Sequence, residues 1–351
     1  MAERYRASDL LECASLLFQR AGLDAPIAAV VAEILVEADL LGYATHGLQF
    51  TPAYIAGIET GRTATSGEPV IINDHGGTLL LDAAGLPGQW VVVKALEMAF
   101  ARLDTHPVVC MVIRGSENIS CLATYVKRAA LQGYMAILTT SSPGNAAVAP
   151  FGGRVAQYST NPMAFGIPTD GNPILIDTSM SSTTNRLLEK TRRTGGRLPG
   201  QWLIDNKGQR SDDPEDFFAD PPGAIAPAGG ADLGHKGFAF AILVEALTSG
   251  LAGVGRADGD DAKGSNIFLQ VIDPAAFGGP DAFKRETGYF AALCRDTPPL
   301  SPDSPVRMPG DRAFDLYERQ QRDGVDLHPE IMARIRPLLE KYQITAPTQI
   351  S

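Results

Sequence analysis

The chain has 351 residues, of which 44% are hydrophobic and 20% charged, and its formal net charge is -10. This length leaves ample material for a buried core, and the composition is that of a folded enzyme rather than a disordered or fibrous chain. The acidic balance, without a stripe of Lys and Arg, predicts that nucleic acid is not a partner.

Helical and strand patterns alternate along the chain. Residues 7–42 carry two helical patterns, the first expected to be capped by Ser8 and the second to begin at Pro26. Further helices are predicted at 87–103, 121–132, 183–194, 237–252, 280–295 and 329–342, and strands at 108–113, 134–140, 163–168, 173–177 and 266–273. Clusters of Asp, Pro and Gly predict irregular chain at 205–232, and five prolines predict an extended crossing at 296–311. The alternation indicates an α/β or α+β enzyme.

The cysteines and the N-terminal segment indicate a compartment. The four cysteines are scattered, form no C-x-x-C pair and lie mostly in apolar stretches, as is typical of free thiols in a reducing environment. The N-terminal segment has charges of both signs and no apolar run followed by a cleavage site, and no uncharged run approaches about twenty residues. We therefore expect a cytoplasmic protein without a membrane partner.

Short motifs that identify common enzyme classes are absent. The sequence has no P-loop, no H-E-x-x-H, no G-x-S-x-G and no His or Cys cluster with metal-ligand spacing, so no metal is expected. The string GVGRAD at 253–258 lacks the third glycine of a dinucleotide loop and follows a helical pattern, which favours a simple turn. These signals alone predict only an α/β protein.

Five blocks, in order and at similar spacing, resemble the malate/L-lactate dehydrogenase type-2 family. They are ADLLGYATHGLQFTPAYIAGIETGR at 38–62, AVAPFGGRVAQYSTNPMAFGIPTD at 147–170, PILIDTSMSSTTN at 173–185, GHKGFAFAILVEALTSGLAGVG at 234–255 and MPGDR at 308–312. The resemblance implies a non-Rossmann NAD(P)-binding fold with a mainly antiparallel sheet flanked by helices, which explains the missing glycine fingerprint. It also implies a homodimer. We expect a helical and dimerisation domain from residues 1–75 and 312–351, and an NAD(P)-binding domain from 76–311 with a small helical or irregular excursion at 186–232.

The resemblance also implies an activity and a set of site residues. Members of this family use NADH or NADPH to reduce small 2-oxoacids or, in some branches, cyclic imines bearing a 2-carboxylate. By position His46 is the proton donor, a role that suits an imidazole near neutral pH, and Thr45 stands where the family has Ser. Substrate contacts are expected from Phe50, Tyr54 and Thr160. Cofactor contacts are expected from Asn118, Ile119, Ser120, Cys121, Leu122, Asp177, Thr178, Ser179, Met180, Lys236, Gly237, Pro309, Gly310 and Asp311.

Each of these assignments has a plainer alternative. A lone histidine is more often a surface or satisfied core residue than a catalytic one, Thr160 also fits a polar turn, and Lys236 also fits a solvated surface. The sequence does not separate NADH from NADPH. Arg114, Arg192 and Arg193 are basic and near the cofactor blocks, and are candidates for a phosphate contact only in that sense.

Three departures from the family concern the substrate. Phe50 stands where the family usually has an Arg that clamps a carboxylate, Glu117 and Asn118 replace its Asn-x-His, and the acid that orients the catalytic His in some members falls near Leu187. Either the carboxylate is held elsewhere or the substrate lacks one. The departures predict a specialised member with a more apolar substrate, such as a cyclic imine or a biosynthetic intermediate.

Two functions from other classes remain open at this stage. The changes at positions 50 and 118 are also compatible with a non-catalytic member that acts as a binding or assembly protein. A lyase or isomerase could use His46 as a base beside a cofactor that serves as a scaffold. The retention of Thr45-His46-Gly47 and Thr160-Asn161-Pro162 favours the oxidoreductase.

Overall fold

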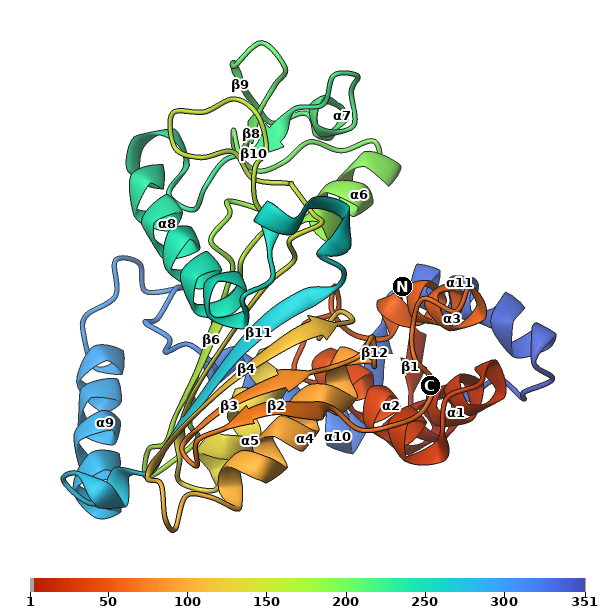
Figure 1. Ribbon diagram of the computed structural model, residues 1–351. Helices are drawn as coiled ribbons and strands as arrows, with labels where there is room; N and C mark the ends of the chain where they lie inside the picture. Colours follow the sequence, from red (N-terminus) through yellow and green to blue (C-terminus); the bar gives the residue numbers. More distant parts are fainter. Residues whose placement is uncertain (1–2, 351) are drawn as a thin grey trace.

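A central sheet of seven strands dominates the computed structural model, which describes residues 3–350 apart from the side chains of residues 260 and 261 (Figure 1). The strand order is β2–β3–β4–β11–β5–β6–β7. Their bounds are Val70–Asp74 for β2, Thr78–Asp82 for β3, Val108–Ser116 for β4, Ser265–Ile272 for β11, Met135–Ser141 for β5, Met163–Ile167 for β6 and Ile174–Thr178 for β7. The β3–β4 pair is parallel and the other pairs are antiparallel, which confirms the mainly antiparallel sheet.

The two central strands are rich in β-branched and other apolar residues. In β4 and β11 the register places Ile113, Met111 and Val109 opposite Ile267, Leu269 and Val271, and all six side chains are fully buried. Packing between cross-strand pairs of such side chains stabilises paired strands. The core of the molecule therefore lies along these strands.

Helices cover the sheet on both faces. On one face lie α4 (Gly88–Phe100) and α5 (Ala123–Leu131), which pack beneath the strands in Figure 1. On the other, α8 (Gly230–Glu245) runs into a π-helical turn at Ala246–Gly250 that contacts β4, β5 and β11. Helix α9 (Pro280–Arg295) lies beside the β6–β7 turn, where the Thr287 hydroxyl donates to the Pro168 carbonyl at 2.6 Å.

Segments from both ends of the chain form a helical layer on one side of the sheet (Figure 1). It contains α1 (Ala7–Ala21), α2 (Ala25–Leu40), α3 (Thr51–Glu59), α10 (Asp311–Asp323) and α11 (Pro329–Lys341), and a small sheet of β12 (Val325–Leu327), β1 (Glu3–Tyr5) and β13 (Gln349–Ile350). Glu37 of the buried helix α2 accepts hydrogen bonds from Lys127 at 2.7 Å and Arg128 at 2.6 Å. This ion pair network ties α2 to α5.

The segment after β7 forms a small unit above the sheet in Figure 1. It contains α6 (Asn185–Arg193), β8 (Leu203–Ile204), β9 (Arg210–Ser211), α7 (Pro214–Phe217) and β10 (Ala224–Ile225). Leu188, Leu198 and Ile225 of this unit belong to a buried cluster that also includes Val148 and, from α8, Val244. Short 3-10 turns complete the described elements at Leu48–Phe50, Arg256–Asp261 and Pro274–Ala276.

Two local predictions need correction. Ser8 does not cap α1, because the helix begins at Ala7 and the Ser8 hydroxyl donates to the Asp9 carboxylate at 2.9 Å. Residues 205–232 are not wholly irregular, because Asp213 caps α7 by accepting the Glu215 N–H at 3.1 Å. The start of α2 at its proline is confirmed.

The division into two domains stays a prediction. Strand β2 pairs with β3 across the expected boundary at residue 75. Within residues 3–350, no helix has both the length and the apolar character needed to cross a membrane.

Candidate active site

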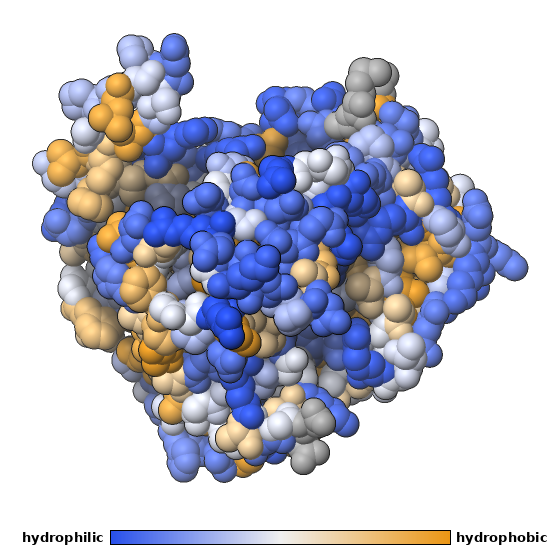
Figure 2. Space-filling model, turned by 90° about the horizontal axis from the view of Figure 1, so that it is seen from above, coloured by the Kyte–Doolittle hydropathy of each residue, from blue (hydrophilic) through white to orange (hydrophobic). Residues whose placement is uncertain are grey.

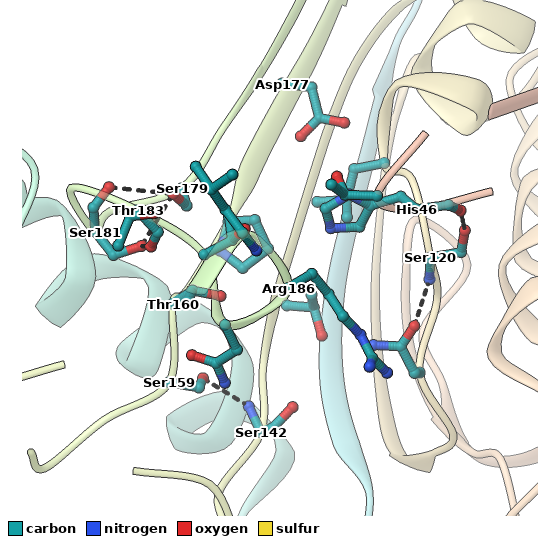
Figure 3. Close-up of a pocket in the computed structure, with 18 of the residues that line it drawn as sticks. His46, Ser120, Ser142, Ser159, Thr160, Asp177, Ser179, Ser181, Thr183 and Arg186 are labelled. Atoms are coloured by element: carbon teal, nitrogen blue, oxygen red, sulfur yellow. Dashed lines mark hydrogen bonds between the residues drawn. The ribbon is translucent and has the colours of Figure 1, made fainter. Parts of the chain in front are cut away.

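A cavity of about 690 Å³ lies where the helical layer, the ends of the central strands and the small unit after β7 meet (Figure 3). Its lining brings together eleven of the predicted site residues: Thr45, His46, Phe50, Asn118, Ile119, Ser120, Leu122, Thr160, Asp177, Thr178 and Ser179. A cavity of this size lies within the range of small-molecule and cofactor sites.

His46 stands on the loop that follows α2. Its Nδ1 is hydrogen-bonded to Thr45 Oγ1 at 2.8 Å, and its carbonyl accepts a hydrogen bond from the Ser120 hydroxyl. Burial, and to a smaller extent the charge of Arg186, lower the pKa of His46 to about 4. The imidazole is therefore neutral at neutral pH and is held in a fixed orientation.

Asp39, in the last turn of α2, supports the loop that carries His46. Its Oδ2 accepts the Leu48 N–H at 2.8 Å, while Oδ1 has no hydrogen-bond partner within the described part of the chain. A Cβ added at Gly47 would lie 2.2 Å from the Asp39 carboxyl, so only glycine fits there. Burial raises the pKa of Asp39 to about 7. Sequence reasoning missed this residue, although an acid inside an apolar helical pattern was a signal for it.

Tyr54 lies one layer behind the cavity rather than in its wall. Its ring stacks on Phe50 with centroids 5.3 Å apart, and its hydroxyl donates to Asn118 Oδ1 at 2.8 Å. The same Asn118 oxygen accepts the Ser120 N–H at 2.9 Å. Tyr54 thus supports two wall residues, and Phe50 is the ring of the pair that lines the cavity.

The carboxylate of Asp177, at the end of β7, is hydrogen-bonded within the protein. Its Oδ2 accepts the Ala123 N–H at 2.9 Å, at the start of α5, and lies 3.7 Å from the Cys121 sulfur. Burial raises the pKa of Asp177 to about 6 and that of the Cys121 thiol well above its usual value. Asp177 therefore caps α5, and Cys121 faces Asp177 instead of the cavity.

Three predicted cofactor residues of the second half of the chain pack elsewhere. Met180 is buried in the cluster that joins the small unit to α8. Lys236 is exposed on α8, and a Cβ at Gly237 would lie 2.4 Å from the Ala228 carbonyl, so this glycine allows close packing of α8. None of the three lines the cavity.

The Pro-Gly-Asp segment before α10 also lies outside the cavity. The Pro309 carbonyl accepts the Leu175 N–H at 3.0 Å, and Gly310 has a φ of +100°, which favours glycine. Asp311 forms an ion pair with Arg295 at 2.6 Å. These contacts anchor the start of α10 to β7.

The three arginines considered as phosphate partners all pair with carboxylates away from the cavity. Arg114 contacts Asp82 at 3.0 Å, Arg192 contacts Glu215 at 2.9 Å, and Arg193 pairs with Glu330. None of them is among the residues that line the cavity.

Sequence reasoning missed the wall formed by the link from β7 to α6. Ser181, Ser182, Thr183, Thr184, Asn185 and Arg186 follow the predicted Ser179 and line the cavity. Thr183 Oγ1 and Asn185 Oδ1 are buried and have no hydrogen-bond partner among residues 3–350. The signal was present in the hydroxyl-rich string SMSSTTN, but the matched block ended at position 185, one residue before Arg186.

The wall fits a cofactor with several hydrogen-bonding groups. Buried polar atoms that lack a protein partner are costly unless a ligand or water satisfies them. Thr183 and Asn185 supply two such atoms, and the neighbouring hydroxyls supply others. A nicotinamide dinucleotide, with ribose and phosphate oxygens along its length, matches this donor and acceptor set.

Comparisons with known proteins match nearly the whole chain. A family model described as malate/L-lactate dehydrogenase matches residues 5–336. The L-lactate dehydrogenase of Cupriavidus necator is 30% identical over 332 residues, which cover 92% of this chain and 93% of that protein. The crystal structure of malate dehydrogenase from Entamoeba histolytica superposes with a TM-score of 0.92 at 24% identity, covering 99% of this chain and 100% of the other. The delta1-piperideine-2-carboxylate reductase from Pseudomonas syringae pvar. tomato gives a TM-score of 0.83 at 25% identity, covering 96% and 99%.

The matches run through nearly the whole chain, and the curated relatives are named as dehydrogenases. One of them, from Chromohalobacter salexigens, is named (2R)-3-sulfolactate dehydrogenase (NADP(+)). The chain belongs to the malate/L-lactate dehydrogenase family.

Proposed function

We propose that the protein is an NAD(P)H-dependent oxidoreductase that reduces the C=O or C=N bond of a small 2-oxoacid or cyclic imine, or catalyses the reverse oxidation. The observation that carries this proposal is the half-buried His46, fixed by Thr45 in the wall of a polar cavity. We further propose that the substrate is a specialised one, because Phe50 replaces the expected arginine.

His46 and Thr45 handle the proton. With Nδ1–H donating to Thr45 Oγ1, the imidazole keeps the lone pair of Nε2 for the substrate. In the oxidation direction, neutral His46 accepts the proton of the substrate hydroxyl as the hydride leaves carbon. In reduction, the protonated ring returns that proton to oxygen or nitrogen. A bound nicotinamide ring supplies or accepts the hydride.

The turn from Asn118 to Leu122 and the wall from Thr178 to Asn185 would hold the cofactor. Thr178 and Ser179 offer hydroxyls, and Thr183 and Asn185 offer the unpartnered oxygens. Thr160 lies across the cavity from His46 in Figure 3, where it could contact the substrate. Both NADH and NADPH are candidates.

We also propose that the protein is a homodimer in the cytoplasm. Figure 2 shows hydrophobic residues gathered on the left, the side on which Figure 1 has α8 and α9. Exposed large apolar side chains on these two helices include Phe240, Ile242, Leu243, Tyr289, Phe290 and Leu293. Contiguous apolar surface of this kind favours association.

The four cysteines are free thiols, as expected in a reducing compartment. Light scattering on the purified protein tests the dimer, and the mass of a single chain would contradict it.

Cofactor binding and hydride transfer test the oxidoreductase. Titration with NADH and NADPH, followed by nicotinamide fluorescence, should give saturable binding. Absorbance at the nicotinamide band should then fall when pyruvate, oxaloacetate, 3-sulfopyruvate or Δ1-piperideine-2-carboxylate is added.

The outcomes separate the competing functions. Cofactor binding without turnover of any carbonyl or imine would favour a binding protein, and substrate conversion without net change in nicotinamide would favour a lyase or isomerase. Absence of binding to both nucleotides would refute the proposal.

A further inference from the structure

The guanidinium of Arg186 and the imidazole of His46 lie against the same aromatic ring. The Arg186 guanidinium carbon is 4.6 Å from the ring centroid of Phe50, and the His46 and Phe50 centroids are 5.9 Å apart. Phe50 itself stacks on Tyr54, with 15° between the ring planes. The two aromatic rings form a platform that holds a cation beside the candidate proton donor. In Figure 3, the Arg186 side chain lies below His46, and Thr160 lies to the left of both.

Arg186 is the only Lys or Arg among the described residues that line the cavity. Its one hydrogen bond to a described residue joins Nη1 to Glu189 Oε2 at 2.8 Å. Glu189 is 45% exposed, so water screens this pair, whereas the Arg186 side chain is 25% exposed. Nη2 and Nε therefore remain available for an anion in the cavity.

The position of Arg186 is unfavourable for the stability of the helix that carries it. Thr184 caps α6, which makes Arg186 the second helical residue. The partial positive charge at a helix N-terminus disfavours a cation in the first turn. A half-buried arginine at this position is better explained by binding of an anion than by its contribution to folding.

We propose that Arg186 binds the carboxylate that adjoins the reacting carbon, and so makes the enzyme specific for 2-oxoacids or for imines bearing a 2-carboxylate. This inference rests on the proposed function of His46. Arginine is suited to the role because its planar fork donates two parallel hydrogen bonds to one carboxylate. Phe50 leaves no cation on the His46 loop, and its ring supports a guanidinium that comes from α6. A positive charge is therefore present beside His46, but it comes from α6 instead of from the His46 loop.

A cofactor phosphate is the other anion that could contact Arg186. The location of the guanidinium favours the substrate carboxylate over such a phosphate. The guanidinium shares the Phe50 ring with His46, and its charge is close enough to lower the pKa of that imidazole. A group bound there lies beside the atom that receives the proton. The hydroxyl-rich wall that would hold the cofactor continues from Ser179 to Asn185.

The test compares Arg186→Gln with Arg192→Gln. Arg192 is a matched control, because it lies on the same helix and its guanidinium carbon is 4.5 Å from the Phe218 ring, but it pairs with Glu215 outside the cavity. Calorimetry measures the binding of oxamate, an unreactive analogue of pyruvate, to each protein saturated with its preferred nicotinamide nucleotide. Oxamide, which has no carboxylate, is the neutral probe.

We expect Arg186→Gln to weaken oxamate binding by about 10- to 100-fold, since charge-assisted hydrogen bonds are lost, and Arg192→Gln to change it by less than about twofold. Oxamide binding and nucleotide affinity should stay within about twofold in both variants. If Arg186→Gln does not fold, Arg186→Lys should give an intermediate loss, because it keeps the charge without the planar fork. The double variant Phe50→Arg/Arg186→Gly should recover oxamate binding.

Three results would overturn the assignment: unchanged oxamate binding in Arg186→Gln, no oxamate binding to the wild type, or a loss of nucleotide affinity as large as the loss for oxamate. The last would assign Arg186 to a cofactor phosphate. Oxamate binding does not require turnover, so failure of the carboxylate assignment is distinguishable from failure of the proposed reaction.

Discussion

Replacing Asp39 by Asn isolates the ionisation of one buried carboxyl. Asp39 is 4% exposed, and burial raises its pKa from an ordinary 3.8 to about 7 against the opposing effect of the Leu48 N–H. Between these two pH values the folded protein holds a proton that the unfolded chain has released. The contribution of Asp39 to the free energy of unfolding therefore falls as pH rises from about 4 to about 7, and is constant above.

The size of this effect follows from the shift. A difference of about three pKa units corresponds to about 4 kcal/mol. Asn cannot ionise, and it retains an oxygen for the Leu48 N–H. The two proteins need not be equally stable at pH 4. Between pH 4 and pH 8, we expect the free energy of unfolding of Asp39→Asn to increase by up to about 4 kcal/mol relative to that of the wild type.

Urea unfolding, followed by circular dichroism at several pH values, measures this gain. Glu12→Gln, at an exposed position on α1, removes a charge without a buried environment and is the control. His46 and Asp177 also have shifted pKa values, but both are present in wild type and variant and cancel in the difference. A difference between Asp39→Asn and wild type that is the same at pH 4 and pH 8 would refute the reasoning.

Four further predictions concern the same region. His46→Gln should lower kcat by about 100-fold or more while nicotinamide affinity, measured by fluorescence, stays within about twofold; an equal loss of affinity would contradict a role in proton transfer. For oxidation of a hydroxy acid, kcat/KM should fall only as the pH drops toward about 4, because neutral His46 accepts the proton; a midpoint at 6.5 would contradict the lowered pKa. Gly47→Ala should destabilise the protein by about 1–3 kcal/mol in urea unfolding, and by less in an Asp39→Ala background where the clashing carboxyl is gone. Glu37→Ala should cost about 3–5 kcal/mol by the same measurement, since it leaves a buried lysine unpaired, and a loss below about 1 kcal/mol would show that the network is dispensable.

Local patterns predicted most of the long elements of the fold, but they missed helices α3 and α10 and most of the short elements. The strands at the centre of the sheet carry runs of apolar residues such as VVCMVI, which indicate buried strands directly. Strand β1 has three residues, and β2 has no buried residue, so neither has a pattern to detect. The order of strands was not readable either, because the placement of β11 between β4 and β5 depends on packing across the whole molecule.

The candidate site was predicted in part, for a related reason. Matched blocks located the His46 loop and the end of β7, and the turn at 118–122 was expected to contact the cofactor; these three segments do meet in one cavity. The same blocks contain residues whose roles are in packing, such as Gly237 and Gly310, and a block does not separate the two kinds. Arg186 lies one residue beyond the end of the block at 173–185, and its place in the cavity wall against the Phe50 ring became evident only in the structure.

The central position of β11 affects how the chain reaches its native state. Strands β4 and β5 are its two neighbours in the sheet, yet about 120 residues separate the end of β5 from the start of β11. On the ribosome, both strands are synthesised long before the strand that joins them, so each presents an unpaired apolar edge during elongation. Closure of the sheet is therefore a late, non-local event, and chains that stop before residue 265 lack the strand that holds its two halves together.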